Sequence, residues 1–155
     1  MRLISKIIST SLGVGYCPLA PGTAGSLFAI LVYWFLPQID NLTFLSFLII
    51  LFFVGVFSAK VTEKEFIQRV GYEKGHDPSI VVIDEVVGVL IAVFAIPKTI
   101  PFFISAFILF RLFDIVKPFP INTSQKIPHG WGIVIDDVIA GVYANVLIQI
   151  FKFLK

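Results

Sequence analysis

Three groups of charged residues interrupt otherwise apolar stretches of this 155-residue chain. They are the adjacent pair Asp84 and Glu85, the pair Arg111 and Asp114 at helical spacing, and the adjacent pair Asp136 and Asp137. Ionisable groups within apolar helices are costly to bury and are usually functional. Carboxylates without thiolates or imidazoles suit a hard cation, Mg²⁺ first and Mn²⁺ or Ca²⁺ as alternatives. The pattern predicts a divalent-cation site with five candidate ligands: Asp84, Glu85, Asp114, Asp136 and Asp137. The alternative is that the acids are solvated helix N-termini, which cannot apply to Asp114 because it ends its apolar run.

A glycine-rich segment, residues 18–26, stands before the first apolar run. Gly22 and Gly25 free the backbone there, and Thr23 and Ser26 offer hydroxyl groups. A glycine-rich turn that enters a helix points unpaired N–H groups at an anion, often a phosphate. These four residues are therefore candidate phosphate ligands, and a plain turn with a helix N-cap is the alternative.

Two cations are the nearest in sequence to the carboxylates, Arg111 and Lys117. A guanidinium holds phosphate oxygens through a planar fork, and an ammonium acts as a mobile point charge. Internal pairing of Arg111 with Asp114 is the alternative. His129 could donate a proton to a leaving oxygen, although a histidine in a surface loop is the commoner outcome.

The composition defines the elements that must position these residues. Hydrophobic residues make up 57% of the chain and charged residues 14%, where soluble domains carry about 25%. This excludes an ordinary soluble protein and a disordered chain, and a net charge of +2 without a basic stripe argues against nucleic-acid binding. The single Cys17 and two histidines exclude an internal disulfide and disfavour a zinc cage. The chain is therefore expected to be one small polytopic membrane domain over residues 1–155.

Charge-free stretches predict an all-α fold of four to five hydrophobic helices. A bilayer core needs roughly 20 helical residues. The expected helices cover residues 42–58, 80–96, 100–116 and 134–153, with a shorter one at 26–36 that either spans or re-enters. Residues 60–74 predict a short polar helix with Thr62 as its N-cap, and residues 1–15 predict an interfacial helix.

Alternation of these spans brings the acidic pairs to one level. The first pair begins a span, Asp114 ends the next and the last pair begins the one after, so all face the same side. With five spans and a cytoplasmic N-terminus, nine Lys and Arg residues lie on that side and Lys98, Lys152 and Lys155 on the other. This bias predicts that the site faces the cytoplasm.

Rows of small residues accompany the acids at helical spacing. Gly88 follows Asp84 by four residues, and Gly141 follows Asp137 by four. Such rows let helices approach closely. They favour clustering of the acids, and generic packing in a membrane is the alternative.

Four segments resemble the phosphatidylglycerophosphatase A family and cover about a third of the chain. They are GVGYCPLAPGTAGS at residues 13–26, HDPSIVVIDEVVG at 76–88, FRLFDIVKPFPI at 110–121 and HGWGIVIDDVIAG at 129–141. The order and number of the segments make the resemblance far more specific than any one of them.

The resemblance implies a Mg²⁺-dependent, all-helical phosphatase in the bacterial cytoplasmic membrane, with several spans. It would remove the terminal phosphate of phosphatidylglycerophosphate, its phospholipid partner, and give phosphatidylglycerol. The family's acidic motif positions fall on Asp84, Glu85, Asp114, Asp136 and Asp137, its basic ones on Arg111 and Lys117, and its Gly-Thr-x-Gly-Ser block on residues 22–26. In the mechanism this suggests, Arg111 holds the phosphate, and a carboxylate free of metal, Asp84 or Asp137, takes the proton of water. A covalent aspartyl-phosphate is the alternative.

Three alternative functions are weighed against this one. An ion-coupled transporter would place acids near the bilayer midplane and usually shows inverted repeats, and no repeat is visible. A non-catalytic membrane subunit would leave five convergent carboxylates unused. Other lipid enzymes that use paired aspartates or a histidine nucleophile need motifs that this sequence lacks. The sequence does not determine the oligomeric state.

Overall fold

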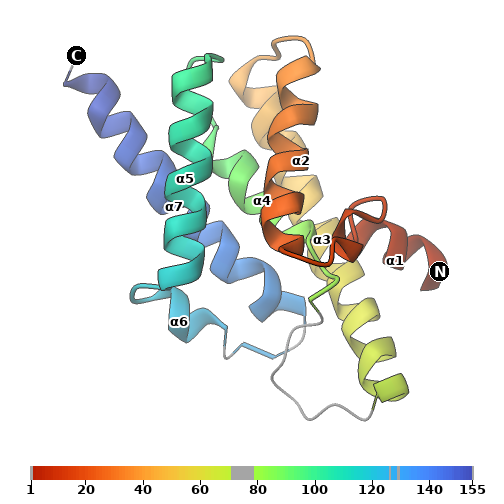
Figure 1. The fold of residues 1–155 in the computed structure, drawn as a ribbon. Helices are drawn as coiled ribbons and strands as arrows, with labels where there is room; N and C mark the ends of the chain where they lie inside the picture. The colour runs from red at the N-terminus through yellow and green to blue at the C-terminus, as the bar shows by residue number, and fades with distance from the viewer. Residues whose placement is uncertain (1, 71–78, 126, 129, 155) are drawn as a thin grey trace.

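The computed structural model describes residues 2–70, 79–125, 127–128 and 130–154, and this part of the chain is helical without strands. The elements are α1 (Arg2–Ser9), the 3₁₀ helix η1 (Val14–Tyr16), α2 (Pro21–Phe35), α3 (Asn41–Val70), α4 (Ile83–Ala92), α5 (Ile100–Val116), α6 (Ile121–Ser124) and α7 (Gly130–Phe153). The all-α prediction is therefore confirmed. In Figure 1, α2 and α5 stand at the front, α3 and α7 lie behind them, and α4 lies between.

Helix α2 begins five residues earlier than the sequence predicted. Pro21 occupies its first turn, where a missing N–H costs nothing and the fixed φ angle suits a helix. The glycine-rich segment therefore forms the first turns of α2, instead of a turn before it. The helix ends at Phe35, ahead of Pro37.

Asp40 begins α3 as its N-cap. Its Oδ1 atom accepts hydrogen bonds from the N–H groups of Leu42 and Thr43, both at 3.0 Å. The Thr43 hydroxyl donates to Asp40 Oδ2 at 2.6 Å, and this bond, together with that from the Thr43 N–H, holds the pKa of Asp40 below its usual value. These bonds satisfy N–H groups that the helix itself leaves unpaired.

Helix α3 runs without a break through residues 60–70 of the polar segment, so the predicted separate helix with Thr62 as N-cap is wrong. Residues 71–74 of that segment lie outside the described residues. The 30 residues of α3 extend over about 45 Å. Thr62 is buried inside α3, and its hydroxyl forms a 2.8 Å hydrogen bond with that of Ser9. This bond ties α1 to α3 where α3 changes from apolar to polar residues.

Within the described part of the chain, two helices are long and apolar enough to cross a membrane, Asn41–Gln68 and Gly130–Phe153. Only 33% and 44% of their apolar stretches are buried, so most of each faces outward, unlike a soluble core helix. Leu3 and Ile4 of α1 are also exposed, at 71% and 63%. These exposed apolar faces agree with a membrane location.

Helix α4 is shorter than the predicted span 80–96 at both ends, because it begins at Ile83 and ends at Ala92. Side chains of α7 bind the carbonyl groups that this end leaves unpaired. The Asn145 amide donates to Ala92 O at 3.1 Å and to Phe94 O at 2.7 Å, and the Gln149 amide donates to Ala95 O at 3.2 Å. In apolar surroundings backbone groups need such partners, so α7 makes the early end of α4 stable.

Candidate active site

The close crossing of α4 and α7 brings two of the acidic groups together. A Cβ atom on Gly141 would lie 2.2 Å from the carbonyl oxygen of Gly88, and one on Gly88 would lie 2.7 Å from the carbonyl oxygen of Asp137. Only glycine fits this contact. Asp84 and Asp137 stand one turn before these glycines, so the crossing holds their carboxylates at the same level.

The end of α5 places Lys117 against α7. Lys117 has a left-handed backbone conformation (φ 46°) that ends the helix, and its N–H donates to Phe113 O at 2.8 Å. Its Nζ atom lies 2.6 Å from Asp136 Oδ2 and 3.7 Å from Asp114 Oδ1. Burial alone would lower the pKa of Lys117, but the hydrogen bond and charge of Asp136 outweigh it and raise this pKa. The ammonium therefore stays charged.

Arg111 lies between two acids of different helices. Its Nη1 atom is 2.7 Å from Asp114 Oδ2 and 4.0 Å from Glu85 Oε1. Gly22 of α2 packs directly on this group, since a Cβ there would be 2.1 Å from Glu85 Oε1 and 3.1 Å from Arg111 Nη1. A side chain at position 22 would push Glu85 away, so glycine is needed for the contact.

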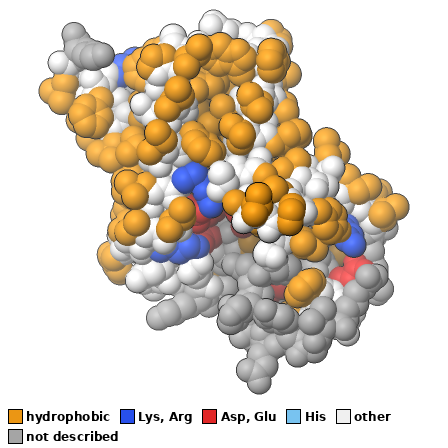
Figure 2. All heavy atoms as spheres, in the orientation of Figure 1, with side chains coloured by type: hydrophobic (Ala, Val, Ile, Leu, Met, Phe, Trp, Pro, Cys, Tyr) orange, Lys and Arg blue, Asp and Glu red, His pale blue; other side chains and the backbone are white. Residues whose placement is uncertain are grey.

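These groups line one cavity of about 260 Å³. Its walls come from the start of α2, the segment before α4, the first turn of α4, the end of α5 and the first third of α7. All five predicted carboxylates, both predicted cations, Gly22 and Thr23 line it. Figure 2 shows basic and acidic side chains gathered in a hollow on the face formed by α2 and α5, below an apolar surface.

Two of the predicted phosphate ligands lie away from the cavity. Ser26 is fully buried, and its hydroxyl donates to Gly22 O at 2.8 Å. Gly25 packs against Val82, where a Cβ would lie 2.9 Å from the Val82 Cβ. Both residues hold α2 against its neighbours and do not line the cavity.

Sequence reasoning missed one polar residue of the cavity. Ser79, just before α4, contributes to its wall. It stands inside the segment 76–88 that carries the family resemblance, which was the available signal, but it has no charge. His76 and His129 lie outside the described residues.

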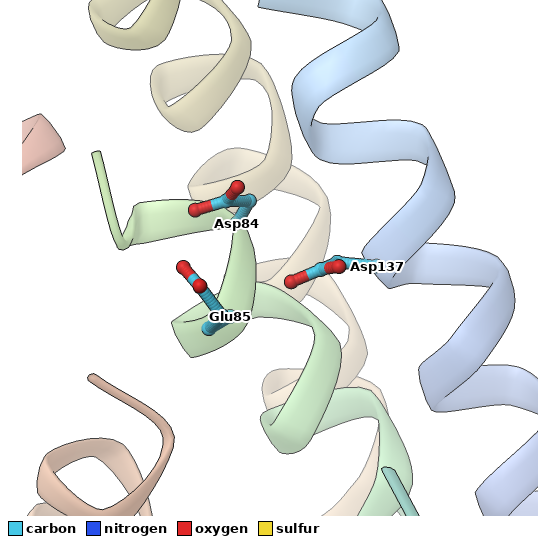
Figure 3. A group of neighbouring side chains, drawn as sticks. All are labelled: Asp84, Glu85 and Asp137. Carbon is cyan, nitrogen blue, oxygen red and sulfur yellow. The ribbon is translucent and has the colours of Figure 1, made fainter. Parts of the chain in front are cut away.

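The carboxylates fit a divalent cation. Oxygen atoms of Asp84, Glu85 and Asp137 lie within 4.8 Å of one another, and so do oxygen atoms of Asp114, Asp136 and Asp137. Figure 3 shows the side chains of the first set converging from α4 and α7. Asp84 Oδ1, Glu85 Oε2 and Asp137 Oδ2 are buried without a hydrogen-bond partner. Buried oxygens of this kind are expected where a cation completes the site.

Unsatisfied donors line the same cavity. Arg111 Nε is also buried without a hydrogen-bond partner. Gly22 and Thr23 precede the first backbone bond of α2, in which the Ala24 N–H donates to Ala20 O at 2.9 Å. Their N–H groups have no partner within the helix. The cavity therefore offers acceptors for a cation and donors for an anion.

Comparisons with known proteins identify the family of the chain. The family model for phosphatidylglycerophosphatase A matches residues 7–152. A Bacteroides thetaiotaomicron protein with the provisional name phosphatidylinositol-3-phosphatase is 40% identical over 95% of this chain and 92% of its own. Proteins named phosphatidylglycerophosphatase A from Haemophilus influenzae and Escherichia coli are 38% and 34% identical, over 95% and 88% of this chain and 88% and 76% of their own. No solved structure matches significantly. The chain belongs to the phosphatidylglycerophosphatase A family.

Proposed function

We propose that this protein is a Mg²⁺-dependent phosphatase that hydrolyses the terminal phosphomonoester of phosphatidylglycerophosphate. The observation that carries the proposal is a single cavity in which unpartnered carboxylate oxygens face Arg111 and Lys117. Family membership supports the same reaction. Hydrolysis of a phosphomonoester needs both kinds of group. The cations bind its anionic oxygens, and the carboxylates hold the metal and take the proton of the water that attacks phosphorus.

The cationic half binds and orients the phosphate. Arg111 and Lys117 attract its oxygens, and the free N–H groups of Gly22 and Thr23 add donors at a helix N-terminus. Because these groups are fixed before substrate binds, they stabilise the charge that develops during phosphoryl transfer without reorganising.

The acidic half holds the metal and moves the proton. Asp84, Glu85 and Asp137 would hold Mg²⁺, with Asp114 and Asp136 beside them. When bound, the cation supplies charge neutralisation at the phosphate and lowers the pKa of water. The water oxygen bonds to phosphorus as the bond to the lipid alcohol breaks. A carboxylate oxygen of Asp84 or Asp137 that does not hold the metal takes the water's proton and passes a proton on to the departing alcohol oxygen, so that the lipid leaves as the free alcohol.

A second substrate is favoured by the name of the Bacteroides relative, which specifies a phosphate on phosphatidylinositol. Both lipids present a phosphomonoester beyond a glycerophospholipid backbone. They differ in the alcohol, which is a primary alcohol of glycerol in one and a ring hydroxyl of inositol in the other. A comparison of the two lipids therefore belongs in the test.

The direct test is release of orthophosphate by the purified protein in detergent. We expect hydrolysis of phosphatidylglycerophosphate with Mg²⁺, loss of activity in EDTA, recovery when Mg²⁺ is restored, and poor replacement by Zn²⁺. Phosphatidylinositol 3-phosphate serves as the comparison substrate. Full turnover in EDTA would remove the metal from the proposal. Absence of turnover on both lipids, with cation-driven uptake by reconstituted vesicles, would favour the transporter.

We also propose a multi-pass protein of the bacterial cytoplasmic membrane whose cavity opens toward the cytoplasmic side. Lys98 and Lys152 support this orientation, because both lie at the end of the bundle away from the cavity. Lys98 donates to Leu36 O, and Lys152 donates to Ala95 O at 3.4 Å. Few basic residues at that end fit the far side of the membrane.

Cysteine labelling tests this orientation in intact cells. In a background in which Cys17 is replaced, Asn122→Cys near the cavity and Gln38→Cys at the other end give exposed thiols. We expect an impermeant maleimide to label position 38 directly and position 122 only after permeabilisation. The reverse pattern would overturn the orientation.

A further inference from the structure

The cavity contains five carboxylates, and their contacts divide them into two kinds. Asp84, Glu85 and Asp137 each keep a buried oxygen atom without a hydrogen-bond partner. Asp114 and Asp136 each have a cationic nitrogen at hydrogen-bond distance. The division therefore rests on the cations. One oxygen of Asp114 and one of Asp136 already have a cationic nitrogen at hydrogen-bond distance, whereas among the described residues no cationic nitrogen comes that close to Asp84, Glu85 or Asp137.

The first group provides a site for a metal ion. Asp137 is only 3% exposed, and its unpartnered Oδ2 atom belongs to the cluster with Asp84 and Glu85. The three side chains point toward one another in Figure 3. Three buried carboxylates repel one another, and a hard divalent cation is the ligand that relieves this repulsion with oxygen donors.

The oxygens of the second group are close enough together to hold a metal ion, but the cations beside them disfavour one. Oxygens of Asp114, Asp136 and Asp137 also lie within 4.8 Å of one another. However, Lys117 Nζ is 2.6 Å from Asp136 Oδ2, and Arg111 Nη1 is 2.7 Å from Asp114 Oδ2. A divalent cation bound at about 2 Å from these oxygens would meet two like charges nearby. The lysine and the arginine therefore stand where a second metal would bind.

We propose that Asp84, Glu85 and Asp137 hold the divalent cation, and that Asp114 and Asp136 are positioning residues for Arg111 and Lys117. The two cations are then kept at fixed positions in the cavity that the metal ligands also line. Phosphate as their ligand rests on the proposed function, whereas the division between metal ligands and positioning residues does not depend on it.

The metal part is tested with two matched substitutions in the same cavity, Asp84→Asn and Asp136→Asn. Binding of Mn²⁺ to the full chain in detergent, without substrate, is followed by electron paramagnetic resonance. We expect Asp84→Asn to weaken binding at least about tenfold, as changes at or near metal ligands do, and Asp136→Asn to leave it near the wild-type affinity. Equal weakening in both variants would overturn the division. If Asp84→Asn does not fold, Glu85→Gln provides the same comparison.

The positioning part is tested by kinetics and by inhibition with orthophosphate. Asp136→Asn and Lys117→Gln should each raise KM and the inhibition constant of orthophosphate more than they lower kcat, because they misplace a binding group. The double variant should resemble each single variant, since either substitution alone already breaks the pair of Lys117 and Asp136. Additive effects, or a change in kcat alone, would contradict a positioning role. If no phosphomonoester is hydrolysed but Mn²⁺ binding follows the expected pattern, the proposed function fails and the metal site stands.

Discussion

Replacement of Asp137 by asparagine is expected to lower kcat by at least about two orders of magnitude, because Asp137 is proposed to hold the metal or to take the proton of water, and loss of general acid–base help alone typically has this effect. Asp137 is 3% exposed and contributes to both clusters of carboxylate oxygens in the cavity. Asparagine keeps its shape and removes one charge from a crowded set. The variant should therefore fold, and without metal its melting temperature should equal or exceed that of the wild type.

Asp40→Asn is the matched control for this substitution. Asp40 is an exposed acid that caps α3, far from the cavity lining. It should keep wild-type turnover, because asparagine is also a good N-cap. Turnover, melting temperature and the shift of melting temperature with Mg²⁺ are measured for both variants. Near-normal kcat in Asp137→Asn would make the start of α7 a scaffold only.

A single methyl group at the crossing of α4 and α7 is expected to disrupt the site without touching any charged residue. In Gly141→Ala the new Cβ would meet the carbonyl oxygen of Gly88 at 2.2 Å, and a backbone atom cannot move aside as a side chain can. The helices must separate, at a typical cost of about 1–3 kcal/mol for overpacking. Because a shift of about 1 Å between catalytic groups can cost 10²-fold, we expect kcat to fall by a similar factor.

Gly55→Ala tests whether the contact, and not the residue type, causes this effect. Gly55 is also a buried helical glycine, facing α4 from α3, but a Cβ there would lie 3.5 Å from Ile83, which is an ordinary contact. We expect little change in melting temperature or turnover. Equal losses in both variants would show that glycine in these helices matters for a reason other than the crossing.

The sequence predicted that the carboxylates lie at the same end of the helices, because this placement depends only on successive helices running in opposite directions. Each acidic group stands at one end of an apolar stretch, and antiparallel succession brings a start, an end and a start to the same side. Asp84, Asp114 and Asp137 do line one cavity. Their individual roles stay predictions, since contacts alone do not assign chemistry.

Helix boundaries were less predictable, because partners distant in sequence determine them. The end of α4 at Ala92 depends on the amides of Asn145 and Gln149, which an apolar stretch does not reveal. The start of α2 at Pro21 moved the glycine-rich segment into a helix. Helical spacing then turned Ser26 inward, onto the carbonyl of Gly22, and left Gly22 and Thr23 at the cavity.

The opening of the cavity on the face of α2 and α5 affects how a lipid substrate is presented to the protein. Figure 2 shows the charged hollow directly below the apolar surface of that face. Under the proposed function, a lipid arriving there would diffuse within one leaflet and need not leave the bilayer, so the bulk solution would not set its supply. Occupancy of the cavity would then depend on the fraction of lipids in the leaflet that carry the phosphate, and saturation would be a property of membrane composition.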